Sequence, residues 1–168
     1  MVEKRQHFLF SRMEGPVLNQ KAIKFLACGF GSGLAPVAPG TFGTLAGVPI
    51  CLFCLPLPWF WRLPVVLALT ALSIYVSGRA EEIYRKKDDQ RIVIDEIIGL
   101  QVTMLPVPIT ALHLFAGFIL FRAFDIFKPF PLKNLQNLPG GWGVVMDDVG
   151  AGIYAGALLF AFYWLEII

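Results

Sequence analysis

The 168-residue sequence is 57% hydrophobic and only 15% charged, whereas soluble domains carry about 25% charged residues. This apolar excess excludes an intrinsically disordered chain, which has low hydrophobicity and high net charge. The formal net charge of +2 is too small for a nucleic-acid-binding protein, which carries a clustered basic surface. We therefore expect a small integral membrane protein that contacts the lipid bilayer and no nucleic acid.

In chain order, residues 1–24 form a basic N-terminal segment, and residues 25–168 form a single membrane domain. The uncharged stretches 45–61 and 63–77 predict a helical hairpin with a proline-rich tip, near the lower length limit for crossing a bilayer. The second arm is expected to continue as a charged helix over residues 79–87. The polar residues that follow it break the helical pattern.

A second apolar region, residues 97–121, contains no formal charge. Pro106 and Pro108 lie near its middle and favour a second hairpin, with arms over 93–105 and 110–127, rather than one crossing. The first of these arms is short and is expected to be partly re-entrant. With a last segment over 149–168, the sequence predicts an all-α protein, a small polytopic helical bundle of about five membrane segments.

The basic residues define the expected orientation, because positively charged loops stay in the cytoplasm. They fall in three clusters, over residues 4–24, 79–91 and 122–133. Two hairpins place all three clusters on one side of the membrane, with Arg62 as the exception. We therefore expect a cytoplasmic N-terminus and a C-terminus outside.

Five carboxylates lie where the predicted segments meet the membrane edge: Asp95, Glu96, Asp125, Asp147 and Asp148. Acidic residues there indicate a functional site. Favourable placement at helix N-termini is an alternative, but it explains neither two adjacent pairs nor Asp125 at a helix end. Clustered carboxylates cannot all ionise without a cation, and oxygen ligands suit Mg²⁺ or Mn²⁺ better than Zn²⁺. These five residues are therefore the catalytic and metal-binding candidates. Because Mg²⁺ is typically bound by a few carboxylates together with a substrate phosphate, the cluster also indicates a substrate that carries phosphate.

Residues 29–44, GFGSGLAPVAPGTFGT, are rich in glycine and lead into the first membrane helix. Backbone N–H groups of such a loop can bind an anion, although tight packing of small residues is the alternative. Arg122 and Lys128 can share a helical side with Asp125 and bind phosphate oxygens, or merely anchor the helix at the interface. The phosphate-binding candidates are Gly31, Ser32, Gly40, Thr41, Gly43, Thr44, Arg122 and Lys128.

The sequence lacks the residues that other phosphatase mechanisms require, or has them in unsuitable places. His7 lies in the polar N-terminal segment and His113 in an apolar one, which disfavours a phosphohistidine. The sequence contains neither a Cys-x₅-Arg loop nor an Asp-x-Asp pair, and the CxxC of Cys51 and Cys54 lies in an apolar run where thiols are inert packing. The remaining mechanism is attack on phosphorus by metal-activated water, with carboxylates as ligands and base.

Four motifs, GFGSGLAPVAPGTFGT, IVIDEIIG, FRAFDIFKPFP and GGWGVVMDDVGAG, resemble in order and spacing the bacterial phosphatidylglycerophosphatase A family. The resemblance covers about residues 25–155. It implies an inner-membrane, Mg²⁺-dependent enzyme that removes the terminal phosphate of phosphatidylglycerol phosphate to give phosphatidylglycerol, the late step before cardiolipin synthesis, and the basic clusters place its site on the cytoplasmic face. Because these positions match the family motifs, the resemblance implies that the five carboxylates are the metal-binding and catalytic residues. It likewise implies that Lys128 and the 31–44 loop bind the phosphate.

Two other functions remain open at this point. A small membrane transporter or ion pathway would use carboxylates as relays, but those are expected near mid-span rather than at span ends. A CDP-alcohol phosphotransferase would need an Asp-Gly-x-x-Ala-Arg signature, which the sequence lacks. Three acidic residues outside the cluster, Asp88, Asp89 and Glu166, are expected to be solvated or terminal and dispensable.

Overall fold

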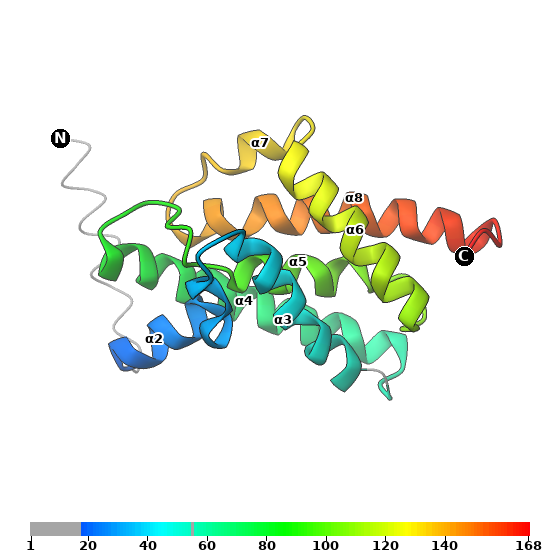
Figure 1. Cartoon of the computed structure of the whole chain (residues 1–168), viewed down its shortest axis with the longest axis horizontal. Coiled ribbons are helices and arrows are strands. Elements are labelled where there is room, and N and C mark those ends of the chain that lie inside the picture. The colour runs from blue at the N-terminus through cyan, green and yellow to red at the C-terminus, as the bar shows by residue number, and fades with distance from the viewer. Residues whose placement is uncertain (1–17, 55) are drawn as a thin grey trace.

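The computed structural model describes residues 18–54 and 56–168, and within them the chain forms helices and no strand (Figure 1). The all-α prediction is therefore confirmed for this part of the chain. In order, the elements are α2 (Gln20–Ala27), the 3₁₀ helix η1 (Gly29–Leu34), α3 (Pro39–Phe53), α4 (Trp59–Tyr84), α5 (Ile94–Thr103), α6 (Ala111–Phe127), α7 (Leu132–Leu135) and α8 (Gly141–Trp164).

The chain reverses direction at both predicted turns. The second pair, α5 and α6, lies close to its predicted bounds, and the Thr110 side chain caps α6 by accepting a hydrogen bond from the His113 N–H at 3.1 Å. The first helix begins at Pro39 rather than at residue 45, because proline fits the first helical turn, where no N–H is needed. The last helix begins at Gly141 rather than at 149, so the acidic pair lies inside it.

α5 occupies the centre of the bundle (Figure 1), where it contacts α3, α4, α6 and α8. The two arms of the first expected hairpin do not pack mainly against each other: α3 packs mainly against α5, and α4 packs against α8 and, less extensively, against α5. The short α5 is thus enclosed by longer helices, and its side chains from Ile97 to Thr103 are buried. The sequence indicated that α3 and α4 would pair as a hairpin, but in the structure both helices pack around this central helix instead.

Glycines bring α5 and α8 into backbone contact. A Cβ atom at Gly152 would lie 2.6 Å from the Gly99 carbonyl oxygen, and one at Gly156 would lie 3.0 Å from the Thr103 carbonyl oxygen. A Cβ atom at Gly99 would in turn lie 3.1 Å from the Asp148 carbonyl oxygen. Small residues permit this close approach in helical membrane proteins. The contact fixes the start of α5 relative to the first turns of α8.

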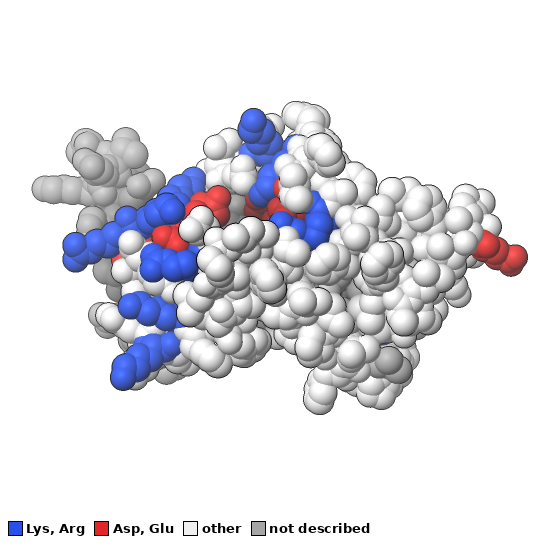
Figure 2. Space-filling model, viewed as in Figure 1, with Lys and Arg blue, Asp and Glu red and all other residues white. Residues whose placement is uncertain are grey.

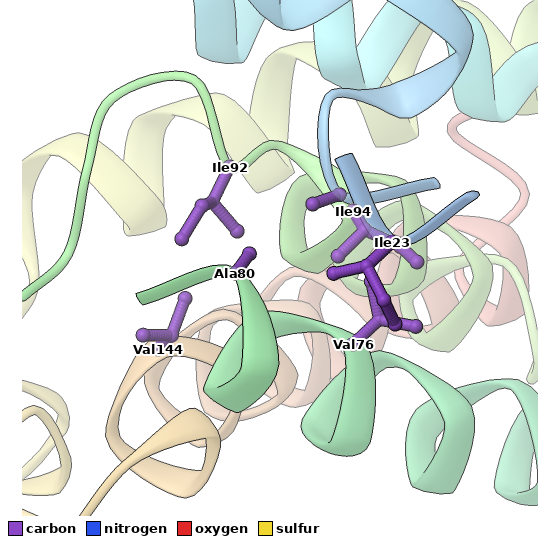
Figure 3. Packing of buried hydrophobic residues seen from close by; sticks show 7 residues of the cluster. Ile23, Val76, Ala80, Ile92, Ile94 and Val144 are labelled. Carbon is purple, nitrogen blue, oxygen red and sulfur yellow. The ribbon is translucent and has the colours of Figure 1, made fainter. Parts of the chain in front are cut away.

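A buried hydrophobic cluster joins α2 to the rest of the fold (Figure 3). Its members come from α2, α4, α5, α8 and the loop before α5: Ile23, Ala27, Val76, Ala80, Ile92, Ile94 and Val144. Helix α2 therefore runs through the boundary that the sequence placed after residue 24. The remainder of the expected N-terminal segment, residues 1–17, lies outside the described residues.

The surface separates charged from apolar residues. Figure 2 shows most of the Lys, Arg, Asp and Glu on this face over one half of the molecule, with a separate acidic group at the opposite end. Large apolar side chains are exposed along the outer helices, among them Leu45, Phe53, Leu67, Phe115, Ile119, Ile153 and Trp164. Such extensive exposed apolar surface marks an interaction site or a lipid-facing one.

Within the described residues, two helical stretches, Phe60–Tyr84 and Gly141–Trp164, are long and apolar enough to cross a membrane, and Pro39–Phe53 is a shorter apolar helix. The ten-residue α5 is too short to span a bilayer alone. The expected number of about five membrane segments stays a prediction.

Candidate active site

The five predicted carboxylates meet at one end of the bundle. Asp95 and Glu96 lie in the first turn of α5, Asp125 in the last turn of α6, and Asp147 and Asp148 in the second turn of α8. All five line one pocket of about 290 Å³. Glu96 is partly exposed and the four aspartates are buried, with Asp147 and Asp148 each only 3% exposed.

Three of these residues form a candidate metal site. Asp95, Glu96 and Asp148 each place a carboxylate oxygen within 4.8 Å of those of the other two. Asp95 Oδ1, Glu96 Oε2 and Asp148 Oδ2 are buried and have no hydrogen-bond partner in the described part of the chain. Unpartnered buried acceptors are costly. A divalent cation that prefers oxygen ligands would satisfy them, so the donor set fits Mg²⁺.

Two cations border the carboxylates from the α6 side. Lys128 ends α6 in the left-handed conformation, with φ 41°, and its Nζ donates a hydrogen bond to Asp147 Oδ2 and lies 3.4 Å from Asp125 Oδ1. The Arg122 guanidinium forms an ion pair with Asp125 at 2.6 Å, and its Nε has no partner among the described residues. Burial by itself would lower the pKa of Lys128, but the facing carboxylates of Asp148 and Asp147 outweigh burial and raise it. Lys128 therefore stays charged beside the acidic cluster.

Gly40, from the glycine-rich segment, lines the same pocket. A Cβ atom there would collide with Glu96 Oε1 and would lie 3.1 Å from Arg122 Nη1 and 3.2 Å from Arg122 Nη2. Only the absence of a side chain at Gly40 lets Glu96 and Arg122 approach α3 this closely. Gly40 thus connects the first motif to the second and third.

The other predicted residues of this segment do not line the pocket. The Thr44 hydroxyl is buried and donates to the Gly40 carbonyl oxygen at 2.9 Å, and the Ser32 hydroxyl donates to the Gly29 carbonyl oxygen at 2.8 Å. Gly43 packs against Val93. Gly31 has open space around it, and Thr41 is partly buried in the first turn of α3. Phosphate binding by Gly31, Ser32, Thr41, Gly43 and Thr44 stays a prediction.

The structure adds pocket residues that the sequence interpretation missed. Asp88, Gln90 and Ile92 line the pocket from the loop between α4 and α5, residues 85–93, which we call the 85–93 loop. The only sequence signal for them is that they immediately precede the acidic pair of α5.

Of the three acidic residues that were expected to be solvated or terminal, one differs from its predicted setting. Asp89 is buried, 4% exposed, because Arg91 Nε and Nη2 donate to its carboxylate at 2.8 and 3.0 Å. Asp88 is exposed but borders the pocket. The expectation that Asp89 is solvated was therefore wrong, whereas Glu166 is exposed near the end of the chain, as predicted.

The remaining candidate chemistry lies away from the pocket. Cys51 and Cys54 are buried free thiols, and Cys51 Sγ donates to Gln101 Oε1 at 3.2 Å. His113 is buried, and its Nδ1 lies 2.7 Å from the Pro108 carbonyl oxygen. None of the three lines the carboxylate pocket, which agrees with the packing roles expected for them.

Fold and site together describe a largely apolar chain whose described residues form helices and an acidic pocket bordered by cations, an arrangement that fits a membrane phosphatase. A model of the family described as Phosphatidylglycerophosphatase A matches residues 25–163. The chain belongs to this family and is a phosphatase, which confirms the resemblance seen in the four motifs. The family and the two apolar helices together indicate a membrane protein.

Curated relatives cover most of the chain. A phosphatidylglycerophosphatase A of Escherichia coli is 36% identical over 137 residues, 80% of either chain. One of Haemophilus influenzae is 38% identical over 150 residues, 85% of this chain and 90% of the relative. A Bacteroides thetaiotaomicron protein described as a candidate phosphatidylinositol-3-phosphatase is 38% identical over 149 residues, 83% of this chain and 92% of the relative. No solved structure matches the chain.

Proposed function

We propose that this enzyme hydrolyses the terminal phosphate of phosphatidylglycerol phosphate in a Mg²⁺-dependent reaction, giving phosphatidylglycerol and inorganic phosphate for phospholipid and cardiolipin synthesis. The observation that carries the proposal is the set of buried, unpartnered carboxylate oxygens from α5 and α8, which share one pocket with Arg122 and Lys128. Acidic ligands for a cation and basic partners for a phosphate thus lie side by side. A relay for transported ions would not need this pairing.

Asp95, Glu96 and Asp148 would hold the metal ion, which when bound supplies a Lewis acid and an activated water. Asp147 lies outside this trio, and within the described part of the chain its Oδ1 has no hydrogen-bond partner, while Lys128 donates to its Oδ2. That free oxygen is suited to accept the proton of the attacking water. Asp125 anchors the two cations, because its carboxylate pairs with Arg122 and Lys128 from the same helix end.

Arg122 and Lys128 are the partners for the phosphate oxygens. Arg122 Nε is buried without a hydrogen-bond acceptor among the described residues, so a phosphate in the pocket would remove an existing cost. A guanidinium can also bind two phosphate oxygens at once. As water adds to phosphorus and the oxygen–phosphorus bond to the lipid breaks, these cations stabilise the charge on the transferred phosphoryl oxygens. The lipid leaves as an alcohol, whose oxygen takes up the proton that the attacking water gave to Asp147.

We further propose that the site faces the cytoplasm in the bacterial inner membrane. Apart from Arg62 and Glu166, the charged residues among those described belong to helix ends and loops at the site end of the bundle. The basic members of this set follow the positive-inside rule if that end is cytoplasmic. A lipid phosphate would then present its head group to the pocket while its acyl chains stay in the bilayer.

The test is a phosphate-release assay on the purified full-length protein in detergent. Phosphatidylglycerol phosphate should yield inorganic phosphate with Mg²⁺, excess chelator should abolish the release, and restored Mg²⁺ but not Zn²⁺ should recover it. Full activity in excess chelator would contradict the metal mechanism. If phosphate were released faster from phosphatidylinositol 3-phosphate, that lipid would be the substrate instead of phosphatidylglycerol phosphate. If neither lipid released phosphate, the transporter alternative would be favoured.

A further inference from the structure

The carboxylate pocket has a wall that the proposed chemistry leaves unused. Asp88 and Gln90 of the 85–93 loop line the pocket, and both side chains are exposed. Among the described residues, neither the Asp88 carboxylate nor the Gln90 amide has a hydrogen-bond or ion-pair partner. Two polar groups thus border the pocket without contributing to the metal cluster or to the pair of cations.

A network of polar contacts holds the backbone of this wall in place. On one side of Gln90, the Asp88 N–H donates to Glu81 Oε1 at 2.7 Å. On the other side, the buried Asp89 carboxylate binds Arg91, whose guanidinium lies 3.9 Å from the centre of the Tyr84 ring. This stacking is a favourable cation–π geometry. The loop is therefore tied to the end of α4 at several points.

The far end of the loop is tied to the glycine-rich segment. The Val93 N–H donates to the Ala27 carbonyl oxygen at 2.8 Å, and Ile92 is buried in the cluster of Figure 3. Gly33 and Gly43 leave room for the loop, because Cβ atoms there would lie 3.0 Å from Val93 Cγ2 and 2.6 Å from Val93 Cβ. Binding groups carried on such a fixed backbone are preorganised.

We propose that Asp88 and Gln90 bind the free hydroxyl of the lipid head group, so that the enzyme selects a phosphate monoester whose head group carries a hydroxyl beside the phosphate. This inference rests on the proposed function. A carboxylate accepts a hydrogen bond from a hydroxyl but repels a phosphate, whereas an amide both donates to and accepts from a hydroxyl. The pair therefore suits the uncharged part of a glycerol head group, next to the phosphate that the cations bind.

Comparing two lipids tests the inference. Phosphatidylglycerol phosphate carries a free hydroxyl beside its terminal phosphate, whereas phosphatidic acid is a phosphate monoester without one. A site that hydrogen-bonds a substrate hydroxyl discriminates against the analogue that lacks it, and most strongly when the site is buried. Because Asp88 and Gln90 are exposed, we expect the wild-type preference for phosphatidylglycerol phosphate to drop by roughly tenfold when either side chain is removed.

The variants are Gln90→Ala and Asp88→Gly, since Asp88 has φ 49°, where glycine is unstrained. Asp88→Asn, which also tolerates positive φ, is the second variant at that position. The matched control is Asn137→Ala, an exposed amide that does not line the pocket. Thermal unfolding in detergent shows that each variant folds.

The expected result is a raised KM for phosphatidylglycerol phosphate in Asp88→Gly and Gln90→Ala, with kcat and the hydrolysis of phosphatidic acid unchanged. Asp88→Asn, whose amide can still bind a hydroxyl, should keep a KM close to that of the wild type. Equal losses on both lipids would overturn the inference, because they would show that the loop only shapes the pocket. Unchanged kinetics on both lipids would overturn it as well. A wild-type enzyme that releases no phosphate from phosphatidylglycerol phosphate would instead contradict the proposed function.

Discussion

We expect a substitution at Gly40 to lower the activity of the protein without lowering its stability. It is the second residue of α3 and does not have a positive φ, so alanine fits its backbone. Its neighbours on the pocket side are the far ends of two side chains, Glu96 Oε1 and the Arg122 guanidinium, rather than backbone. Gly40→Ala should therefore displace a metal-ligand candidate and a phosphate-binding candidate without disturbing the fold.

The magnitude follows from the geometry. A methyl carbon at Gly40 would contact Arg122 Nη1 at 3.1 Å and collide with Glu96 Oε1, whereas relaxed heavy-atom contacts lie at about 3.5–4.0 Å. Glu96 must therefore move by roughly 1 Å, and a misplacement of about 1 Å in an active site costs about 10²-fold in rate. Alanine in a helix is favoured over glycine by roughly 0.5–1 kcal/mol, which offsets the crowding in the free energy of unfolding.

The assay pairs kcat for lipid phosphate hydrolysis with thermal unfolding of the same detergent-solubilised samples. We expect kcat to fall by about 10²-fold, with an unfolding midpoint within a few degrees of wild type. Leu45→Ala, an exposed α3 position away from the pocket, should leave kcat unchanged. Wild-type turnover by Gly40→Ala would refute the placement of Glu96 and Arg122 against α3. An unfolded variant would refute the claim that the neighbouring side chains can yield.

Three further predictions follow from the structure. Asp95→Asn, Glu96→Gln, Asp125→Asn, Asp147→Asn and Asp148→Asn should each insert into the membrane, and most should lose at least about 10²-fold in kcat, while the exposed control Glu166→Gln keeps it. Comparable damage from the control would discredit the cluster. The hydrogen bond from Arg91 outweighs burial and lowers the pKa of Asp89 from 3.8 to about 2, so the pair stabilises the fold above pH 3.8 and ceases to do so as pH falls through 2. The difference in unfolding midpoint between wild type and Arg91→Ala should thus shrink over that interval, and a difference independent of pH would contradict the pairing. Single cysteines at positions 88 and 134, on a background lacking Cys28, Cys51 and Cys54, should react only from the cytoplasmic side and one at 168 only from outside. Labelling of 88 and 134 from opposite sides would overturn the proposed topology.

Local signals in the sequence predicted much of the helical pattern. Pro106 and Pro108 mark the turn before α6, and Thr110 caps that helix as its residue type favours. The start of α3 was missed because glycine and proline around Pro39 look like a loop in sequence, although proline is favourable in a first helical turn. The central position of α5 could not be predicted, because it depends on glycine contacts between residues distant in the chain, such as Gly99 and Gly152.

The candidate site also contains residues that the sequence could predict and residues that it could not. Its carboxylates could be located from the sequence because charges are rare and costly in so apolar a chain. Asp88 and Gln90 could not, because exposed polar residues in a loop carry no such signal. Their position depends on long-range contacts, including the Val93 N–H bound to the Ala27 carbonyl oxygen, which no local pattern reveals.

The backbone contact between α5 and α8 has a consequence for the size of ion that the site accepts. Asp95 and Glu96 lie in the first turn of α5, and the Asp148 carbonyl oxygen on α8 lies against Gly99, so the contact between the two backbones sets how far apart these residues attach to the fold. Mg²⁺ binds oxygen at about 2.0–2.1 Å, whereas Ca²⁺ needs about 2.3–2.6 Å and more ligands. A larger ion would have to displace these side chains, because the glycine contacts resist a change in the distance between the two helices. If the proposed metal site is right, the same glycines that pack the bundle would therefore favour the smaller cation.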